Sequence, residues 1–293
     1  MHLYWEKEPN MNLQRIIIGL SLSTILAAGA QATPVSTIWV DNASFGAPIL
    51  QEYDLTTSAL ITQITAPLGN NGRGVVTVGN VVYYTSANTN GVYAYNYVTN
   101  TNLGTAFTVA GASGLSTMAY DGTNFWIGDY SGTNHAYLYS PTGTLLKTIS
   151  LVNCTGFCDG LEYLNIGGGE LISNRRDGFD GPPNIYDIYD LNGNLLHAAF
   201  ITGHDPNGNT GIAFDGTLFY VDNVNSGTID EFDINGNYLK TLHLTGESYF
   251  AGEDLSVNYA QVLPPSVPEP ASMLLLGSGL VGMGLLRRRR QYR

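Results

Sequence analysis

The sequence predicts an all-β fold, a single β-propeller of five four-stranded blades, and three observations lead to this prediction. The 293 residues include 35 glycines and 19 tyrosines but only 12% charged residues, a composition that suits half-buried strands joined by tight turns. Two hairpin phrases alternate along the chain with a period of roughly 43 to 50 residues. The first unit lacks an inner strand, and the last unit is an inner strand alone.

One phrase reads as an alternating strand, a polar turn and a second alternating strand. Its turns include TTS, PTG and NGN, and Asn and Gly tolerate the positive φ of tight hairpins. The five copies are QEYDLTTSALITQI (51–64), YAYNYVTNTNLGTAFTV (93–109), YLYSPTGTLLKTISL (137–151), DIYDLNGNLLHAAFI (187–201) and DEFDINGNYLKTLHL (230–244).

The second phrase precedes the first and reads as an apolar strand, an Asp-Gly-like turn and an aromatic-rich strand. Two hairpins in each period make four strands, here called a to d from the axis outward, which is the plan of a propeller blade. The copies are GVVTVGNVVYYTS (74–86), STMAYDGTNFWIGD (116–129), LEYLNIGGGELIS (161–173) and GIAFDGTLFYVDN (211–223).

The two ends of the repeat region complete one blade between them. The segment TIWVDN (37–42) matches LFYVDN (218–223) but has no strand a before it, and GEDLSVNY (252–259) is a strand a with nothing after it. Pairing them closes the ring and protects its edges. We therefore expect a propeller domain over residues 33–262, with six blades as the alternative if one divergent unit is present. The other units start near Gly72, Gly114, Gly160 and Gly211.

In pattern and period, residues 37–259 resemble the blade-repeat propellers of the NHL and YVTN type. The resemblance implies the fold and leaves the activity open, because propellers host many unrelated functions.

The N-terminal segment 1–32 has the features of a secretory signal peptide with a short helix. If translation starts at Met11, a basic n-region with Arg15 is followed by an apolar stretch and by Ala30-Gln31-Ala32, an A-x-A cleavage site. We expect export through the Sec translocon.

The C-terminal segment combines a stiff linker, an apolar stretch and a basic end. Residues 263–270 are proline-rich, residues 271–286 carry no charge, and residues 287–293 contain five arginines. A 16-residue helix spans about 24 Å, so it would cross the ~30 Å hydrocarbon core only with thinning of the bilayer or snorkelling of the arginines. The positive-inside rule places Arg287, Arg288, Arg289 and Arg290 in the cytoplasm as a stop-transfer signal.

These residues resemble the PEP-CTERM protein-sorting signal, which consists of Val267-Pro268-Glu269-Pro270, an apolar stretch and an arginine cluster. The resemblance implies a Gram-negative bacterium, an inner-membrane-anchored precursor, and an exosortase that removes the tail near the Pro-Glu-Pro motif. The mature form would then reach the cell surface or an exopolysaccharide matrix.

Charge and cysteine content restrict the partners and the compartment. Residues 41–254 contain five basic and 21 acidic residues, a formal charge of −16, so nucleic acid is an unsuitable partner. An exported chain favours a disulfide between Cys154 and Cys158. Free thiols are the alternative. A structural zinc site is disfavoured, because it needs four ligands and the chain has only two cysteines.

A ligand-binding face is expected where strands b end and strands a begin, because both sets of loops open on one side of a propeller. The acids there suit a cation or a polyol, Tyr130 could stack on a sugar, and Arg175 and Arg176 form a basic island. Asp and Asn at strand ends also cap their own turns, which is the structural alternative. The candidates are Asp41, Asp129, Tyr130, Arg175, Arg176, Asp222, Glu253 and Asp254.

No motif for a nucleophile or a catalytic metal is present, since neither G-x-S-x-G nor H-E-x-x-H occurs. The turns at 190–194, 205–209 and 233–237 mimic calcium loops but lack the EF-hand spacing. We therefore expect a non-enzymatic, surface-sorted propeller that needs no cofactor and binds a glycan or another partner. A secreted glycan-active enzyme using paired carboxylates and a Ca²⁺-stabilised structural protein are the alternatives.

Overall fold

The structure is a computed structural model that describes residues 35–43, 47–130, 132–155, 158–176, 184–205, 208–224, 226–246 and 251–262. The chain divides into two units, Met1–Gln31 and Ala32–Arg293, and every described residue belongs to the second. The predicted signal peptide, Pro-rich linker, membrane helix and arginine tail lie outside the described residues. Within the described ranges, no helix is long and apolar enough to cross a membrane.

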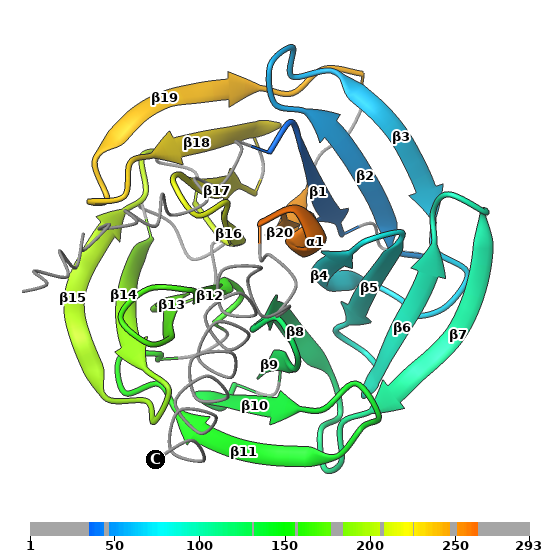
Figure 1. The fold of residues 1–293 in the computed structure, drawn as a ribbon, viewed down its shortest axis with the longest axis horizontal. Coiled ribbons are helices and arrows are strands. Elements are labelled where there is room, and N and C mark those ends of the chain that lie inside the picture. The colour runs from blue at the N-terminus through cyan, green and yellow to red at the C-terminus, as the bar shows by residue number, and fades with distance from the viewer. Residues whose placement is uncertain are drawn as a thin grey trace, which may run out of the picture. The chain divides into compact units, whose positions relative to one another are not determined.

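Five four-stranded antiparallel sheets are arranged around a central axis, as Figure 1 shows. This confirms the predicted propeller and the count of five blades. The composite blade pairs strands from the two ends of the described chain, in the order β20 (Gly252–Ser256), β1 (Thr37–Asn42), β2 (Ile49–Asp54) and β3 (Leu60–Thr65). Val40 of β1 lies opposite Leu255 of β20 in an antiparallel register.

The other four blades each come from one continuous segment, with the inner strand first. They are β4 (Gly72–Val78), β5 (Val81–Ser86), β6 (Gly91–Asn96) and β7 (Thr101–Thr108); β8 (Leu115–Tyr120), β9 (Phe125–Asp129), β10 (His135–Tyr139) and β11 (Leu145–Ser150); β12 (Leu161–Leu164), β13 (Glu170–Asn174), β14 (Ile185–Asp190) and β15 (Leu195–Thr202); β16 (Ile212–Phe214), β17 (Phe219–Asn223), β18 (Thr228–Phe232) and β19 (Tyr238–His243).

The antiparallel order gives the ring two different faces. The b–c and d–a connections open on one face, here called the loop face, and the a–b and c–d turns lie on the opposite face, here called the tail face. A short helix, α1 (Tyr259–Val262), follows the end of β20 and therefore lies on the tail face. Asn258 accepts a hydrogen bond from Gly79 N and donates one to Gly79 O, both 2.9 Å, which fixes α1 to the first turn of the neighbouring blade.

The hydrophobic core is divided into five clusters, and each cluster fills the space between two neighbouring blades. Between the composite blade and the blade of β16–β19, for example, Tyr53 and Val40 pack with Tyr220 and Ile229. The alternation of the strands supplies this arrangement, because each sheet must bury both of its faces against its neighbours.

A glycine stands at the first residue of each inner strand or directly before it, because neighbouring blades approach closely there. A Cβ atom at Gly72 would overlap the carboxylate of Asp41, and one at Gly252 would overlap the carboxylate of Asp222. Asp41 and Asp222 occupy the same place at the ends of β1 and β17. Equivalent overlaps with neighbouring backbone exclude side chains at Gly114, Gly160 and Gly211.

Each c–d ladder contains a β-bulge at the same place. The register shifts near the tail-face end of all five ladders, which leaves one residue of the outer strand without a direct partner. The bulged residues are Ile61, Leu103, Leu146, Leu196 and Leu239. Such bulges twist an edge strand and protect it from pairing with another chain.

Substitution of Gly72 by Ala is expected to destabilise the propeller by about 1–3 kcal/mol, because the methyl group meets the buried Asp41 carboxylate. Urea denaturation of G72A, D41S and the double variant measures the coupling. D41S removes the overlapping atoms, so the double variant should lose less than the sum of the two single changes. Strict additivity would contradict the proposed contact.

Candidate functional site

The structure places most of the predicted ligand-face residues inside the ring rather than at its surface. Asp41, Asp222 and Asp254 are fully buried, and Glu253 and Asp129 nearly so. Tyr130, Arg175 and Arg176 are partly exposed on the loop face.

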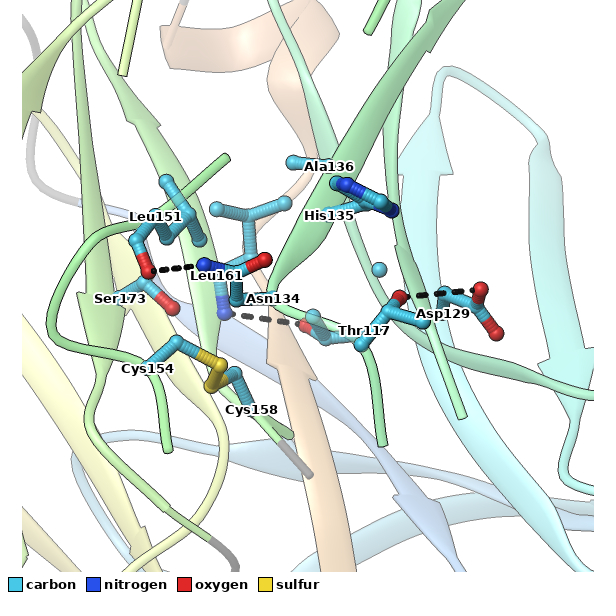
Figure 2. A pocket seen from close by; sticks show the side chains of 12 residues that line it. Thr117, Asp129, Asn134, His135, Ala136, Leu151, Cys154, Cys158, Leu161 and Ser173 are labelled. Carbon is cyan, nitrogen blue, oxygen red and sulfur yellow. Dashed lines mark hydrogen bonds between the residues drawn. A yellow bond between two sulfur atoms is a disulfide. The ribbon is translucent and has the colours of Figure 1, made fainter. Parts of the chain in front are cut away.

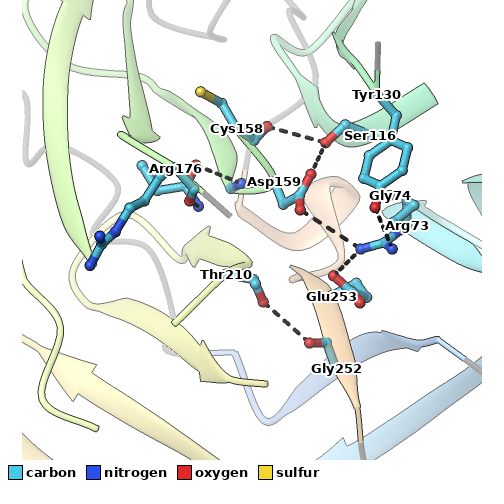
Figure 3. A network of polar contacts seen from close by, with 12 residues as sticks. Arg73, Gly74, Ser116, Tyr130, Cys158, Asp159, Arg176, Thr210, Gly252 and Glu253 are labelled. Carbon is cyan, nitrogen blue, oxygen red and sulfur yellow. Dashed lines mark hydrogen bonds and ion pairs between the residues drawn. The ribbon is translucent and has the colours of Figure 1, made fainter. Parts of the chain in front are cut away.

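Arg73 lies at the centre of a polar network on the loop-face side of the axis (Figure 3). Its guanidinium Nη1 is 2.6 Å from Glu253 Oε2 and 3.7 Å from Asp159 Oδ2. Its Nη2 donates a hydrogen bond of 2.8 Å to the Tyr130 hydroxyl, and the guanidinium carbon lies 4.3 Å from the centroid of that ring. Ser116 donates to Asp159 at 2.6 Å. This network joins four of the five blades around one buried cation.

Asp254 connects three inner strands by a different route. Its Oδ2 accepts hydrogen bonds from the backbone N–H of Val75, at 3.1 Å, and of Met118, at 3.0 Å. Burial raises the pKa of Asp254 well above its ordinary value, although these N–H groups offset part of that effect. The carboxyl group thus bonds the backbone of β4 and β8 to β20, strands that form no ladder with one another in the described part of the chain.

Glu162 forms a second buried carboxyl site, near the tail face. The hydroxyl of Tyr259, the first residue of α1, donates to Glu162 Oε2 at 2.6 Å, and Phe214 N–H donates to the same oxygen at 3.3 Å. Burial raises the pKa of Glu162 to about 8, while the bonds from Tyr259, Tyr163 and Phe214 lower it in part. The pair fastens α1 to the inner strand β12 across the axis.

Asp41 and Asp222 have less hydrogen-bonding support than Glu162. Their four carboxylate oxygens have no hydrogen bond of normal geometry within the described part of the chain. Burial raises the pKa of both carboxyl groups well above the ordinary value; the Arg73 charge offsets part of this for Asp41, and Asn223 N–H does so for Asp222. Both carboxyl groups are packed against glycine, Asp41 beside Gly72 and Asp222 beside Gly252.

The basic island lies at a hollow of about 490 Å³ on the loop face, lined by Val152, Asn153, Thr155, Arg175, Arg176, Asn184 and Ile185. Both nitrogens at one edge of the Arg175 guanidinium contact Asp187, each at 2.7 Å, and Asn153 donates to the same carboxylate at 2.9 Å. The Arg175 fork is thereby held in one orientation. A hollow of this size is within the range of small-ligand sites.

A second, smaller cavity lies beside the disulfide between Cys154 and Cys158, whose Cα atoms are 6.0 Å apart (Figure 2). Its volume is about 10 Å³, which is the room of a single water molecule. Thr117, Asn134 and Ser173 are among the residues around it. It is too small for a ligand, and Cys154 and Cys158 pack within the hydrophobic cluster between the two neighbouring blades.

Within the described ranges, no group of three or more His, Cys, Asp or Glu side chains is placed to hold a metal ion. The calcium-like turns instead satisfy their own backbone: Asp190 Oδ1 accepts hydrogen bonds from Asn192 N and Asn194 N, at 2.8 and 2.9 Å, and Asp233 does the same with Asn235 and Asn237. These contacts are those of Asx turns.

Two parts of this arrangement were not among the residues singled out as site candidates. Arg73 is the first, and its interior position brings it into contact with Glu253, Asp159 and Tyr130. The Glu162–Tyr259 pair was not foreseen. A sequence signal exists for it, because an acid in an inner strand that is otherwise apolar needs a buried partner.

Comparison with known proteins finds two separate similarities, one for the C-terminal segment and one for the propeller fold. Residues 266–290 match the family model described as the PEP-CTERM protein-sorting motif. The fold is similar to a chain in a crystal structure of a nidogen/laminin complex, with a TM-score of 0.51 and 10% identity over 75% of this chain and 97% of that chain. It is also similar to a protein of unknown function from Bacteroides caccae, with a TM-score of 0.51 and 10% identity over 76% of this chain and 98% of that one. No curated protein sequence matches the chain.

At 10% identity these structures show the fold alone. The sorting motif adds the class: it implies an exported, membrane-anchored precursor of a Gram-negative cell-surface protein that exosortase processes. In this chain the motif follows a five-bladed β-propeller domain.

The stability of the propeller is expected to depend on pH through Glu162. Its folded pKa of about 8 lies above the ordinary value of 4.5, so the folded state binds more protons between those values, and the free energy of unfolding falls as pH rises through that window. The contribution is at most about 5 kcal/mol. Glu162→Gln should remove it.

The measurement is urea denaturation of wild type and E162Q at pH 5 and pH 9. The stability of E162Q relative to wild type should increase between the two values. Glu170→Gln, in the same blade but partly exposed, is the matched control. Parallel pH profiles for wild type and E162Q would show that Glu162 does not titrate in this window.

Proposed function

We infer that this protein is a non-enzymatic surface protein whose propeller binds a glycan or another partner, and that the hollow at Arg175 and Arg176 is the binding site. The sorting motif at residues 266–290 is the observation that supports delivery to the cell surface. The hollow is the observation that supports the binding site, because it is a recess lined by Arg175 and Arg176 on an otherwise acidic domain.

Export is supported by two independent parts of the chain. The N-terminal segment 1–32 would direct the chain through the Sec translocon, and the arginines after the apolar stretch would remain cytoplasmic. Both give the same topology, with the propeller outside the inner membrane. The disulfide between Cys154 and Cys158 suits the oxidising compartment that this topology requires.

The chemistry of the hollow favours a ligand that carries a carboxylate, as acidic polysaccharides do. Arg175 is held by Asp187 with its side chain 31% exposed, and Arg176 lies beside it. A guanidinium pairs with a carboxylate through two parallel hydrogen bonds. Val152, which is 61% exposed, and Ile185 add apolar surface at which the face of a sugar ring could pack.

The non-enzymatic assignment is supported by how the acids are used. Asp254, Glu253 and Asp159 are buried and bonded to strands or to Arg73. A glycosidase needs two carboxyl groups that flank a bound substrate, whereas these carboxyl groups hold the inner strands together.

Binding is tested with glycan arrays followed by titration of acidic and neutral oligosaccharides. Arg176→Ala should weaken binding of the acidic ligand by about tenfold or more, because a charge-assisted hydrogen bond contributes about 1.5–3 kcal/mol. Lys147→Ala, a basic residue on an outer strand, is the matched control and should bind as wild type does. Unchanged binding by R176A would move the site elsewhere, and glycan cleavage abolished by one carboxylate substitution would contradict the non-enzymatic assignment.

Processing is tested by mass spectrometry of the protein extracted from the cell surface. The mature chain should end near Pro268-Glu269-Pro270 and lack residues 271–293. Glu269→Ala should leave the tail in place and retain the chain in the inner membrane. An intact arginine-rich C-terminus on wild-type surface material would show that the tail acts only as an anchor.

A further inference from the structure

Exposed apolar side chains are gathered at one place in every blade. Of the eleven large apolar side chains that are exposed in the described residues, all except Val152 lie in a c–d turn or in the first three residues of an outer strand. The bulge position of each blade contributes one of them, and these five residues are here called the apolar rim: Ile61, Leu103, Leu146, Leu196 and Leu239.

Folding does not explain the apolar character of these positions. The five side chains are between 45% and 52% exposed, and their bulges would form equally well with a polar residue. Single exposed apolar residues are ordinary on protein surfaces. Recurrence at one bulge position in all five blades is different, because it distributes apolar groups around the whole circumference that the outer strands form in Figure 1.

The apolar rim lies toward the tail face, which is also the face at which the described chain ends with α1. The outer strands begin at the c–d turns, and these turns share the tail face with α1. After Val262, eight residues, 263–270, precede the apolar stretch of the sorting motif. Eight residues reach at most about 28 Å. In the anchored precursor, therefore, the tail face cannot be far from the lipid surface.

This short tether makes weak contacts effective. A site held by a short linker experiences a local concentration of its partner near the millimolar range. The anchor thus confines the propeller beside the bilayer, and each apolar side chain that enters the interface adds to the contact.

The charges on this face favour uncharged lipid. Asp54, Asp190 and Asp233 lie in exposed c–d turns, and hydrogen bonds from neighbouring Thr or Asn residues lower the pKa of all three carboxyl groups, so they are ionised. Lys147 and Lys240 follow Leu146 and Leu239 but are already engaged, with Asn192 and Glu231 respectively. An anionic headgroup would be repelled, so the contact is apolar rather than electrostatic.

We propose that the apolar rim rests on the surface of the membrane while the sorting segment still anchors the chain. The inference rests on the membrane anchoring of the proposed function. In this arrangement the loop face, with its basic hollow, points away from the bilayer. Removal of the tail ends the tether, and the weak rim contact then releases the propeller.

The test is hydrogen–deuterium exchange of the full chain, incorporated as one copy per phosphatidylcholine nanodisc. The rim variant carries Leu103→Asn, Leu146→Asn, Leu196→Asn and Leu239→Asn. The matched control changes exposed residues at the opposite ends of the same four strands: Thr108→Asn, Ser150→Asn, Thr202→Asn and His243→Asn. Thermal unfolding verifies that both variants fold.

Amides of the c–d turns should exchange roughly threefold more slowly in wild type and control than in the rim variant. Phosphatidylglycerol in the disc should not increase this protection. Equal exchange in wild type and rim variant would overturn the proposal, as would protection that appears only with two or more chains per disc, which would assign the rim to contact between copies.

The same preparations separate this proposal from the proposed function. The rim variant should bind acidic glycan as wild type does, so loss of glycan binding by R176A is independent of the rim. A full chain that does not enter nanodiscs through its tail would contradict the anchoring and, with it, the rim proposal. Normal anchoring without rim protection would contradict the rim proposal alone.

Discussion

The close approach of the five inner strands at the axis is the constraint on which the rest of the structure depends. A glycine at or directly before each inner strand lets that strand lie against the neighbouring blade, and at Gly72 and Gly252 the space is taken by the buried carboxyl groups of Asp41 and Asp222, which lie on the second strands β1 and β17. Among the described residues the inner strands form no ladder with one another, and a single parallel bridge joins Thr77 of β4 to Asn258 after β20. Their free N–H groups need other acceptors, and Asp254 supplies one to two neighbouring blades.

The same constraint explains why so acidic a domain presents few of its central acids to solvent. Carboxyl groups are short, accept several hydrogen bonds and fit beside glycine, so they serve as connectors at the axis. Arg73 compensates two of them, Asp159 and Glu253, and burial raises the pKa values of Asp41, Asp222 and Asp254. The acids that remain exposed are mainly those of turns such as Asp190 and Asp233. Besides these turn acids, the surface presents a basic hollow on the loop face and an apolar rim toward the tail face.

Much of the fold could be predicted because propeller repeats are local. Each hairpin phrase carries its own turn residues and its own alternation, so the strands and the count of five blades followed from the sequence, as did the sharing of one blade by β1 and β20. The candidate site was less accessible. The sequence places Asp41, Asp222 and Asp254 near the loop ends of strands. Their burial, however, depends on how closely neighbouring blades approach, and no local sequence pattern specifies that distance.

The sequence by itself determined the repeat, the closure of the ring and the sorting motif at residues 266–290, since each is written in contiguous residues. Only the tertiary structure decided which polar residues meet. Arg73, Asp159 and Glu253 come from three different blades, and Glu162 meets Tyr259 from 97 residues away. The apolar rim depends on both sequence and tertiary structure. Its leucines are visible in the repeats of the sequence. Their exposure at bulges and their position toward the tail face follow from how the sheets curve around the axis.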